Sequence, residues 1–245
     1  MKKNVAERRT EILAATVAVI AERGFGHTRI ADVAARLGTS TGLLHYHFES
    51  KDLLLAAAFE HAAQRDLIRL SQAIGADGDP LERLVAVLDL YLPAVEGSSW
   101  PIWIDAWGEA LHNPALRSTS QRLDAAWKQG LADVIEQAGG HGSLHCADPA
   151  GAARRLGALV DGLGVDLTLN GGDDDEVMIQ RQARARNWLL TAAEVELHLA
   201  PGRLTQVPGS ARRDQMEQRP TVHPNDIGRG SNGDALHIGN ASGEE

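Results

Sequence analysis

The feature that most constrains the fold is a pair of short amphipathic segments on either side of Gly38. In the first segment, apolar residues recur at the helical spacing i, i+3, i+4, i+7, at Ile30, Val33, Ala34 and Leu37. In the second, Leu44 and Phe48 are four residues apart and therefore share one helix face. Gly38 suits a turn with positive φ. The pattern predicts two helices of about ten and eight residues that cross at a tight turn.

The residue types on these two segments are those that a DNA-reading helix-turn-helix needs. We expect Thr28 to cap the first helix, and we expect small inward residues to let the second helix cross closely, at Ala31, Ala34 and Ala35. The front of the second helix must be free of bulky apolar groups to enter a groove about 12 Å wide. Small and polar residues stand there, at Ser40, Thr41, Gly42, His45, Tyr46 and His47. An ordinary helical hairpin with solvated polar residues is the alternative interpretation.

Charge is distributed unevenly along the chain, whose net charge is −9. Residues 1–51 contain eight Lys and Arg against five Asp and Glu, whereas residues 52–245 contain sixteen against twenty-eight. A basic N-terminal part on an acidic body is typical of a protein that presents a single face to phosphate. Chance variation in a short segment would give the same imbalance.

The rest of the sequence predicts an all-α protein, because apolar spacing is helical throughout and Gly and Pro punctuate it. Helices are expected at 7–23, 51–73, 80–95, 100–112, 114–138, 148–169 and 174–199, besides the two around Gly38. We predict three parts: a three-helix DNA-binding domain at 1–52, a helical ligand-binding and dimerisation domain at 53–200, and a flexible tail at 201–245, where large apolar residues become sparse.

The run from Thr28 to Leu54, TRIADVAARLGTSTGLLHYHFESKDLL, resembles the N-terminal domain of the TetR family of bacterial repressors. The resemblance covers about residues 8–60. It includes the turn glycine, the Phe that ends the reading helix, the Ser-Lys pair and the Leu-Leu that follows. One departure is His45, where the family usually has Tyr. The residues that the residue types and the resemblance together place at DNA are Thr28, Arg29, Thr39, Ser40, Thr41, Gly42, Leu43, His45, Tyr46, His47 and Lys51.

Within that set, the resemblance implies two roles. Thr28, Tyr46, His47 and Lys51 are expected to touch phosphates, while Ser40, Thr41 and Leu43 are expected to face base edges. The resemblance also implies a homodimer that binds a palindromic double-stranded operator and releases it when a small-molecule effector binds. Candidate dimer helices are those at 148–169 and 174–199, whose apolar surfaces could equally belong to the intramolecular core.

Tryptophans cluster in the middle of the chain. Trp100, Trp103 and Trp107 are spaced i, i+3, i+7, and Trp127 follows on the next predicted helix. This region resembles, more weakly, the choline-sensing BetI-like branch of the family, with which Ser40-Thr41-Gly42 is shared. We therefore expect a cationic effector at Trp103, Trp107, Trp127 and Asp105, with Glu109 and Asp124 as further sources of negative charge. Tryptophans that only fill the core are the alternative.

The residues give less support to an enzyme, to a partner-binding protein without DNA affinity, or to a metal site. An all-helical enzyme with Asp105 or Glu109 as a base is conceivable, but no nucleophile and orienting partner stand at recognisable spacing. A partner-binding protein whose N-terminal domain has lost DNA affinity is a third possibility. His141, His145 and Cys146 lack a fourth metal ligand, so we expect no metal and no cofactor. No signal peptide or membrane span is expected, and a single cysteine favours the cytoplasm.

Overall fold

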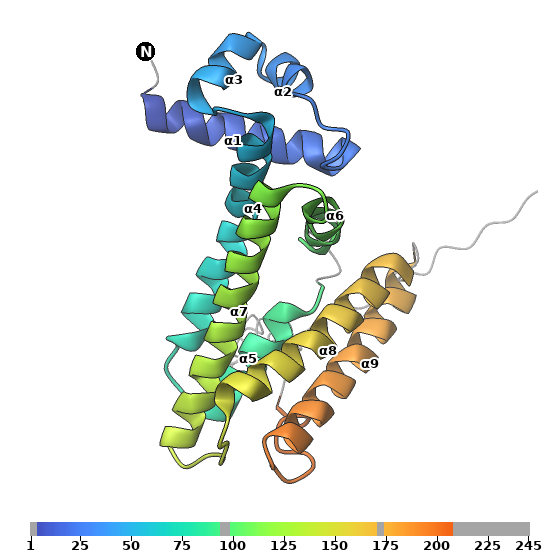
Figure 1. The fold of residues 1–245 in the computed structure, drawn as a ribbon. Coiled ribbons are helices and arrows are strands. Elements are labelled where there is room, and N and C mark those ends of the chain that lie inside the picture. Colours follow the sequence, from blue (N-terminus) through green and yellow to red (C-terminus); the bar gives the residue numbers. More distant parts are fainter. Residues whose placement is uncertain (1–3, 94–98, 171–173, 208–245) are drawn as a thin grey trace, which may run out of the picture. The chain divides into compact units, whose positions relative to one another are not determined.

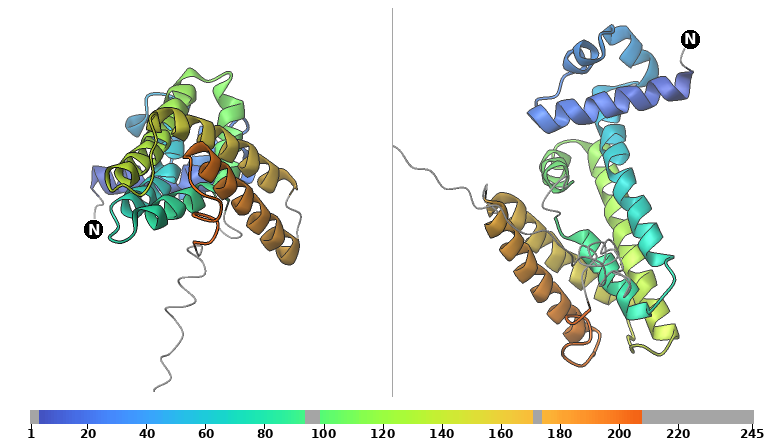
Figure 2. Two further views of the ribbon diagram at one scale, coloured as in Figure 1. Left: turned by 90° about the horizontal axis from the view of Figure 1, so that it is seen from below. Right: turned by 180° about the vertical axis from the view of Figure 1, so that it is seen from behind.

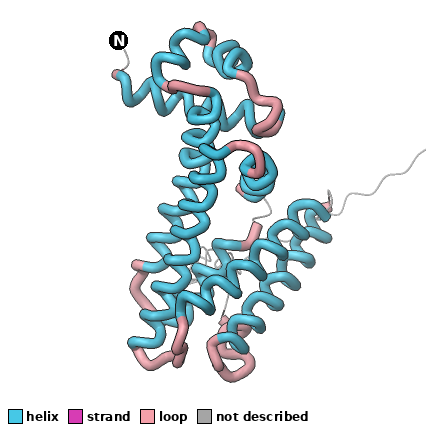
Figure 3. The backbone as a smooth tube through the Cα atoms, viewed as in Figure 1, coloured by secondary structure: helices cyan, strands magenta, loops and turns pink. Residues whose placement is uncertain are grey.

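The computed structural model describes residues 4–93, 99–170 and 174–207. Within these ranges the chain forms α-helices and no strand (Figure 3). The helices are α1 Val5–Arg23, α2 Ile30–Leu37, α3 Thr41–His47, α4 Lys51–Ile74, α5 Pro80–Tyr91, α6 Trp100–Ala110, α7 Pro114–Gly140, α8 Pro149–Asn170 and α9 Asp175–Glu196. The all-α prediction is confirmed. The helix predicted to reach residue 95 ends at Tyr91, just before Pro93, and the last predicted helix ends at Glu196 rather than 199.

Helices α1 to α3, with the start of α4, form the head of the molecule (Figure 1). Gly38 ends α2 with φ 62° and ψ 37°, in the left-handed region that the sequence predicted for this turn. The head has a small core of its own, made of Ile12, Val19, Val33, Ala34, Leu44, Phe48 and Leu54. The prediction of three inward alanines in α2 is corrected: Ala34 is buried, whereas Ala31 and Ala35 are exposed, because they stand outside the stripe that α2 packs against α1 and α3.

The body is built around α4 and α7, which lie side by side along most of their length (Figures 1 and 2). α5, α6 and α8 pack against α7, and α9 packs against α8. The body core joins α4 to all of these helices through large buried side chains such as Phe59, Leu84, Leu88, Leu131 and Ile135. α4 serves both cores, since Leu54 belongs to the head core and Leu55 to the body core. The independence of the predicted domains 1–52 and 53–200 stays a prediction.

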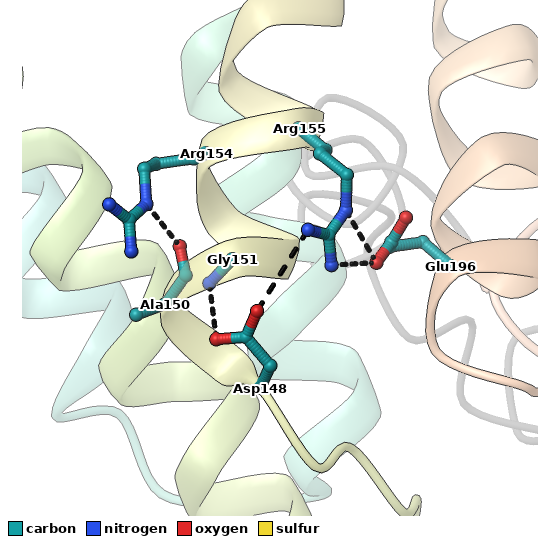
Figure 4. Close-up of polar contacts among 6 residues, drawn as sticks. All are labelled: Asp148, Ala150, Gly151, Arg154, Arg155 and Glu196. Atoms are coloured by element: carbon teal, nitrogen blue, oxygen red, sulfur yellow. Dashed lines mark hydrogen bonds and ion pairs between the residues drawn. The ribbon is translucent and has the colours of Figure 1, made fainter.

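Polar contacts hold α8 against α9 (Figure 4). Arg155 on α8 donates to Glu196 on α9 from Nε at 3.0 Å and Nη2 at 2.6 Å, and its Nη1 lies 3.9 Å from Asp148. Asp148 also accepts from the Gly151 N–H at 2.8 Å, so it caps the first turn of α8. A side chain at Gly151 would collide with the Asp148 carboxylate, since its Cβ would lie 1.8 Å from Oδ2. The ends of the two helices are therefore fixed relative to each other.

The chain after α9 is packed as far as Val207. Glu194 is buried, and its carboxylate accepts from the N–H groups of Gly202, Leu204 and Thr205 at 3.1, 2.7 and 2.9 Å. These donors lower the pKa of Glu194 against the opposing effect of its burial. The prediction of a tail from 201 is therefore corrected for 201–207, because a buried carboxylate binds this segment; the predicted tail from 208 onward lies outside the described residues.

Candidate DNA interface and ligand pocket

Helix α3 has a buried back and a polar front, as a reading helix requires. Leu44 and Phe48 hold its back in the head core, with 1% and 5% of their surface exposed. Its front is exposed at Ser40, Thr41, Gly42, His45 and Tyr46, and Tyr46 shows 75% of its surface to solvent. The front does not pack against the described part of the protein, so it is free to contact another molecule.

Arg9 of α1 fixes the C-terminal end of α3. Its Nη1 donates to the carbonyl of His47 at 3.0 Å, and its guanidinium carbon lies 4.2 Å from the centroid of the Phe48 ring. A cation at a helix C-terminus satisfies carbonyls that have no partner within the helix and complements the helix dipole. The His47 ring is partly buried and lies edge-on to Tyr46, with their centroids 5.2 Å apart. The C-terminal end of α3 is thereby held against α1.

The remaining predicted DNA residues differ in accessibility. Thr28 is 1% exposed, its hydroxyl donates to the Gly24 carbonyl at 2.7 Å and its N–H donates to the Phe25 carbonyl at 3.3 Å. Both of its donors are therefore used inside the protein. Arg29, rather than Thr28, is the N-cap of α2. Arg29 is exposed, and Thr39, Leu43 and Lys51 are partly exposed. Ser50 caps α4 by accepting from the Leu53 N–H at 3.2 Å.

The body contains a pocket walled by aromatic rings. Trp100, Trp103 and Trp107 of α6 and Trp127 of α7 line it, together with Tyr91 at the end of α5. The space free of atoms in the pocket and in front of its mouth, open solvent included, amounts to about 670 Å³. The ring centroid of Trp107 lies 5.9 Å from that of Trp100, with 84° between the ring planes, and 6.1 Å from that of Trp103, with 61° between the planes. The centroids of Tyr91 and Trp127 are 4.5 Å apart, with 67° between the planes. Rings set at steep angles to one another form separate walls, an arrangement that suits an aromatic cage.

The polar lining of the pocket is mostly acidic. Asp66, Asp124 and Asp161 line it, with Arg69 as the basic lining residue. Asp124 pairs with Lys128 at 2.7 Å. Burial raises the pKa of Asp161 above its usual value, and the nearby Asp124 raises it further while Lys128 lowers it. The Tyr91 hydroxyl is buried and has no hydrogen-bond partner among the described residues, and burial raises the pKa of this phenol, so it stays protonated.

The structure corrects the prediction for one pocket residue and adds two others. Asp105 does not line the pocket; its carboxylate points to the head, where Oδ2 accepts from the Phe25 N–H at 2.7 Å. Asp105 is two positions from both Trp103 and Trp107, which places it on the opposite face of α6. Tyr91 and Asp161 line the pocket, although the sequence pattern did not indicate them. A carboxylate inside the apolar run LGALVDGLGV of α8 is the signal that could have revealed Asp161.

Metal binding and membrane insertion gain no support from the geometry. In the described ranges, no group of three or more His, Cys, Asp or Glu side chains is arranged to hold a metal ion. Among the same residues, no helix combines the length and the apolar character that crossing a bilayer requires.

Comparison with known sequences decides the family. Residues 12–58 match the family described as bacterial regulatory proteins, tetR family, and residues 80–195 match the BetI-type transcriptional repressor C-terminal domain. The regulator BetI of Paraburkholderia xenovorans is 33% identical over 190 residues, which cover 72% of this chain and 89% of that protein. The chain belongs to the TetR family. As a member of that family it is a DNA-binding transcriptional regulator with a helix-turn-helix, of the repressor type that its C-terminal match describes, and not an enzyme.

Solved structures of two transcriptional regulators have the same fold. A transcriptional regulator from Saccharomonospora viridis, solved in complex with choline, is 33% identical with a TM-score of 0.62 and matches 73% of this chain and 95% of its own. A TetR-family regulator from Rhodococcus sp. is also 33% identical, with a TM-score of 0.64 over 79% of this chain and 100% of its own. The matches of both structures with this chain confirm the predicted architecture of a helix-turn-helix followed by a helical domain.

Proposed function

We propose that this TetR regulator acts as a homodimer that represses from a palindromic operator and leaves it when a small cation occupies the aromatic pocket. The observation that carries the DNA part is the exposed polar front of α3 on a firmly buried back. Acting on the bacterial chromosome would place the protein in the cytoplasm.

The accessible residues of the head divide into two groups at the DNA. We propose that Ser40, Thr41, Gly42 and Leu43 approach base edges, because they form the first turn of α3 and its cap. Phosphate contacts are assigned to Arg29, Thr39, His45, Tyr46, His47 and Lys51. Lys51 stands in the first turn of α4 and makes no ion pair with another described residue. Thr28 is left out of the set, because its hydroxyl and N–H are already used internally.

Lys51→Ala should weaken binding to all DNA sequences and reduce the slope of log affinity against log salt by about one per subunit, because one phosphate contact is lost. Fluorescence anisotropy with the DNA upstream of the protein's own gene measures both quantities. Lys128→Ala is the matched control, because Lys128 pairs with Asp124 in the body and should leave the salt slope unchanged. Unchanged affinity and slope in Lys51→Ala would contradict the phosphate contact. No specific binding by the unsubstituted protein would remove the proposed function.

The dimer proposal rests on apolar surface left exposed on α8 and α9. Leu169 on α8 is 67% exposed, and Trp188 and Val195 on α9 are 54% and 73% exposed. Val177, Trp188 and Val195 are spaced by eleven and seven residues, which returns each to the same side of α9. On α8, Ala158, Gly162, Val165 and Leu169 form a stripe at i, i+4, i+7, i+11. Apolar stripes on two adjacent helices suit a four-helix seam between two copies.

Trp188→Glu should raise the dimer dissociation constant at least roughly tenfold, since a buried unpaired carboxylate costs free energy and an aromatic anchor is lost. Sedimentation velocity over a range of protein concentrations measures this shift. Asn187→Glu on the neighbouring, exposed position adds the same charge outside the stripe and serves as the control. A Trp188→Glu protein that sediments like the unsubstituted one would place the dimer contact elsewhere.

The effector proposal combines ring geometry with charge. Trp100, Trp103, Trp107 and Trp127 offer ring faces. Asp161 offers a carboxylate that makes no ion pair with another described residue, whereas Asp124 pairs with Lys128. A cation over a tryptophan face gains about 0.5–2 kcal/mol, more when water is excluded. The Tyr91 hydroxyl can donate to an oxygen of the same ligand. The choline complex of the Saccharomonospora viridis regulator supports a quaternary ammonium compound as the class of ligand.

Affinity for such a cation should depend on pH through Asp161. A bound cation favours the ionised carboxylate, and burial together with Asp124 raises the pKa of Asp161 in the unbound protein. Affinity should therefore be highest above that raised pKa and should fall as the pH drops through it. Titrations with choline at pH values from about 4.5 to about 8, followed by tryptophan fluorescence, measure this dependence. The series begins just above the ordinary carboxyl pKa of about 4, because the pKa of Asp161 is raised. Asp161→Asn should remove the pH dependence and weaken binding.

A further inference from the structure

Helix α6 contacts the head on the face opposite the pocket. Asp105 Oδ2 accepts from the Phe25 N–H at 2.7 Å, across 80 positions of sequence, in the turn between α1 and α2. The turn lies so close to α6 that a Cβ on Gly24 would be 3.2 Å from Asp105 Oδ2. Figure 1 shows α6 below the end of α1 where this turn begins. The backbone of the head is therefore attached directly to the helix that carries three pocket tryptophans.

Aromatic packing makes a second connection along the same route. The Phe25 ring lies edge-on to Phe59 of α4 at 6.0 Å, and Phe59 lies edge-on to Trp103 of α6 at 4.8 Å. Phe25 and Phe59 are fully buried, and Phe25 belongs to the body core rather than to the head core. Close-packed interiors transmit displacement, because they contain little free volume to absorb it. A shift of Trp103 must therefore move Phe59, Phe25 or both.

The corner after α6 makes a third connection, at the start of α4. Asn113, which caps α7 by accepting from Leu116 at 3.0 Å, donates from Nδ2 to Asp52 Oδ1 at 3.1 Å. Asn113 is buried, and Asp52 is the neighbour of Lys51 in the first turn of α4. α6 and its C-terminal corner thus hold the head at two separate places, the α1–α2 turn and the start of α4. These contacts add to the packing of α1 on α4, which also holds the head.

We propose that Asp105 is the positioning residue that couples the pocket to the reading helix: its bond to Phe25 makes the α1–α2 turn follow any roll of α6. The proposal rests on the proposed effector-released DNA binding. Trp103 and Trp107 occupy one face of a short helix and Asp105 the other, so a ligand that turns the tryptophans also turns the carboxylate. The head then leaves the orientation in which two copies match successive turns of DNA.

The coupling factor, which is the ratio of operator dissociation constants with and without saturating choline chloride, tests this in the full chain. For the unsubstituted protein we expect a factor of about ten or more, within the usual range for allosteric coupling. Asp105→Ala should reduce it to below about threefold while the choline dissociation constant, read from tryptophan quenching, changes by less than about threefold. Asp105→Asn keeps an acceptor for the Phe25 N–H and should restore most of the factor. Glu109→Ala is the matched control, because Glu109 stands one turn along the same face and close to Gly26 of the same turn, but makes no side-chain hydrogen bond to it.

Two results would contradict the coupling role of Asp105. A coupling factor in Asp105→Ala equal to that of the unsubstituted protein overturns the proposal, as does equal loss in Glu109→Ala. Should Asp105→Ala fail to fold, the comparison of Asp105→Asn with Asp105→Glu, whose longer side chain misplaces the acceptor, decides the same point.

An experiment without any effector tests the coupling role of Asp105 independently of whether choline is the ligand. Linkage is reciprocal, so operator binding at the head must alter the surroundings of the α6 tryptophans. Operator DNA should change acrylamide quenching of tryptophan fluorescence in the unsubstituted protein, and this change should be clearly smaller in Asp105→Ala, where the Phe25–Phe59–Trp103 packing and the Asn113–Asp52 bond remain. Identical responses in the two proteins overturn the coupling role even if choline is inert. An inert choline with this difference intact removes only the cationic effector, and absence of operator binding removes the proposed function and the coupling with it.

Discussion

Replacing Phe59 by alanine is expected to lower the free energy of unfolding by about 3–5 kcal/mol, the usual cost of truncating a fully buried phenylalanine. Phe59 has no exposed surface and touches Phe25 on one side and Trp103 on the other. The cavity would open between the head and the pocket, where the surrounding helices α4 and α6 cannot collapse without breaking other contacts. Urea unfolding followed by circular dichroism measures the change.

The unfolding measurement on Phe59→Ala needs a constant protein concentration and a control variant. Protein concentration must be held constant, because dimerisation adds to apparent stability. Leu53→Ala removes a side chain that is 45% exposed on the same helix and should cost far less. Equal small losses in the two variants would show that Phe59 does not bridge head and body.

Gly164→Ala is expected to open the pocket wall and to weaken cation binding by roughly 30-fold, which corresponds to about 2 kcal/mol of lost cation–π attraction. A Cβ at Gly164 would lie 2.1 Å from the Trp100 ring, so the indole must move. Its movement also breaks the bond from Trp100 Nε1 to the Tyr91 carbonyl, now 3.0 Å long. Overpacking of this kind adds a stability cost of about 1–3 kcal/mol.

Isothermal titration with choline measures the loss in Gly164→Ala. The control is Gly108→Ala on α6, where an added Cβ meets nothing within 4 Å among the described residues and where alanine favours the helix. If Gly164→Ala binds choline as the unsubstituted protein does, Trp100 is not a wall of the binding site.

The helix order could be read from the sequence because apolar periodicity and Gly or Pro punctuation agree nearly everywhere. The back of α3 followed directly from the spacing of Leu44 and Phe48, and the turn from Gly38. These are local properties, because the spacing of apolar residues within one helix indicates which face of that helix is buried. The clustering of the tryptophans was also recognisable, because three of them share one helix.

Contacts between residues on different elements could not be predicted from apolar periodicity. Asp105 was expected beside the tryptophans because it is close to them in sequence, yet it faces the head. Thr28 was expected to cap a helix and instead donates backward to Gly24. Tyr91 and Asp161 reach the pocket from α5 and α8 through long-range packing, which periodicity within a single helix does not specify.

The carboxylate of Glu194 has a practical consequence for shortening or tagging the protein. A chain cut after residue 200 would lose the three amide donors at 202, 204 and 205 and would strand an anion in the interior. A cut or fusion placed after Val207 keeps all three, together with the bond from Arg186 to the Val207 carbonyl. The packed part of the chain therefore extends beyond the end of α9 at Glu196, at least as far as Val207.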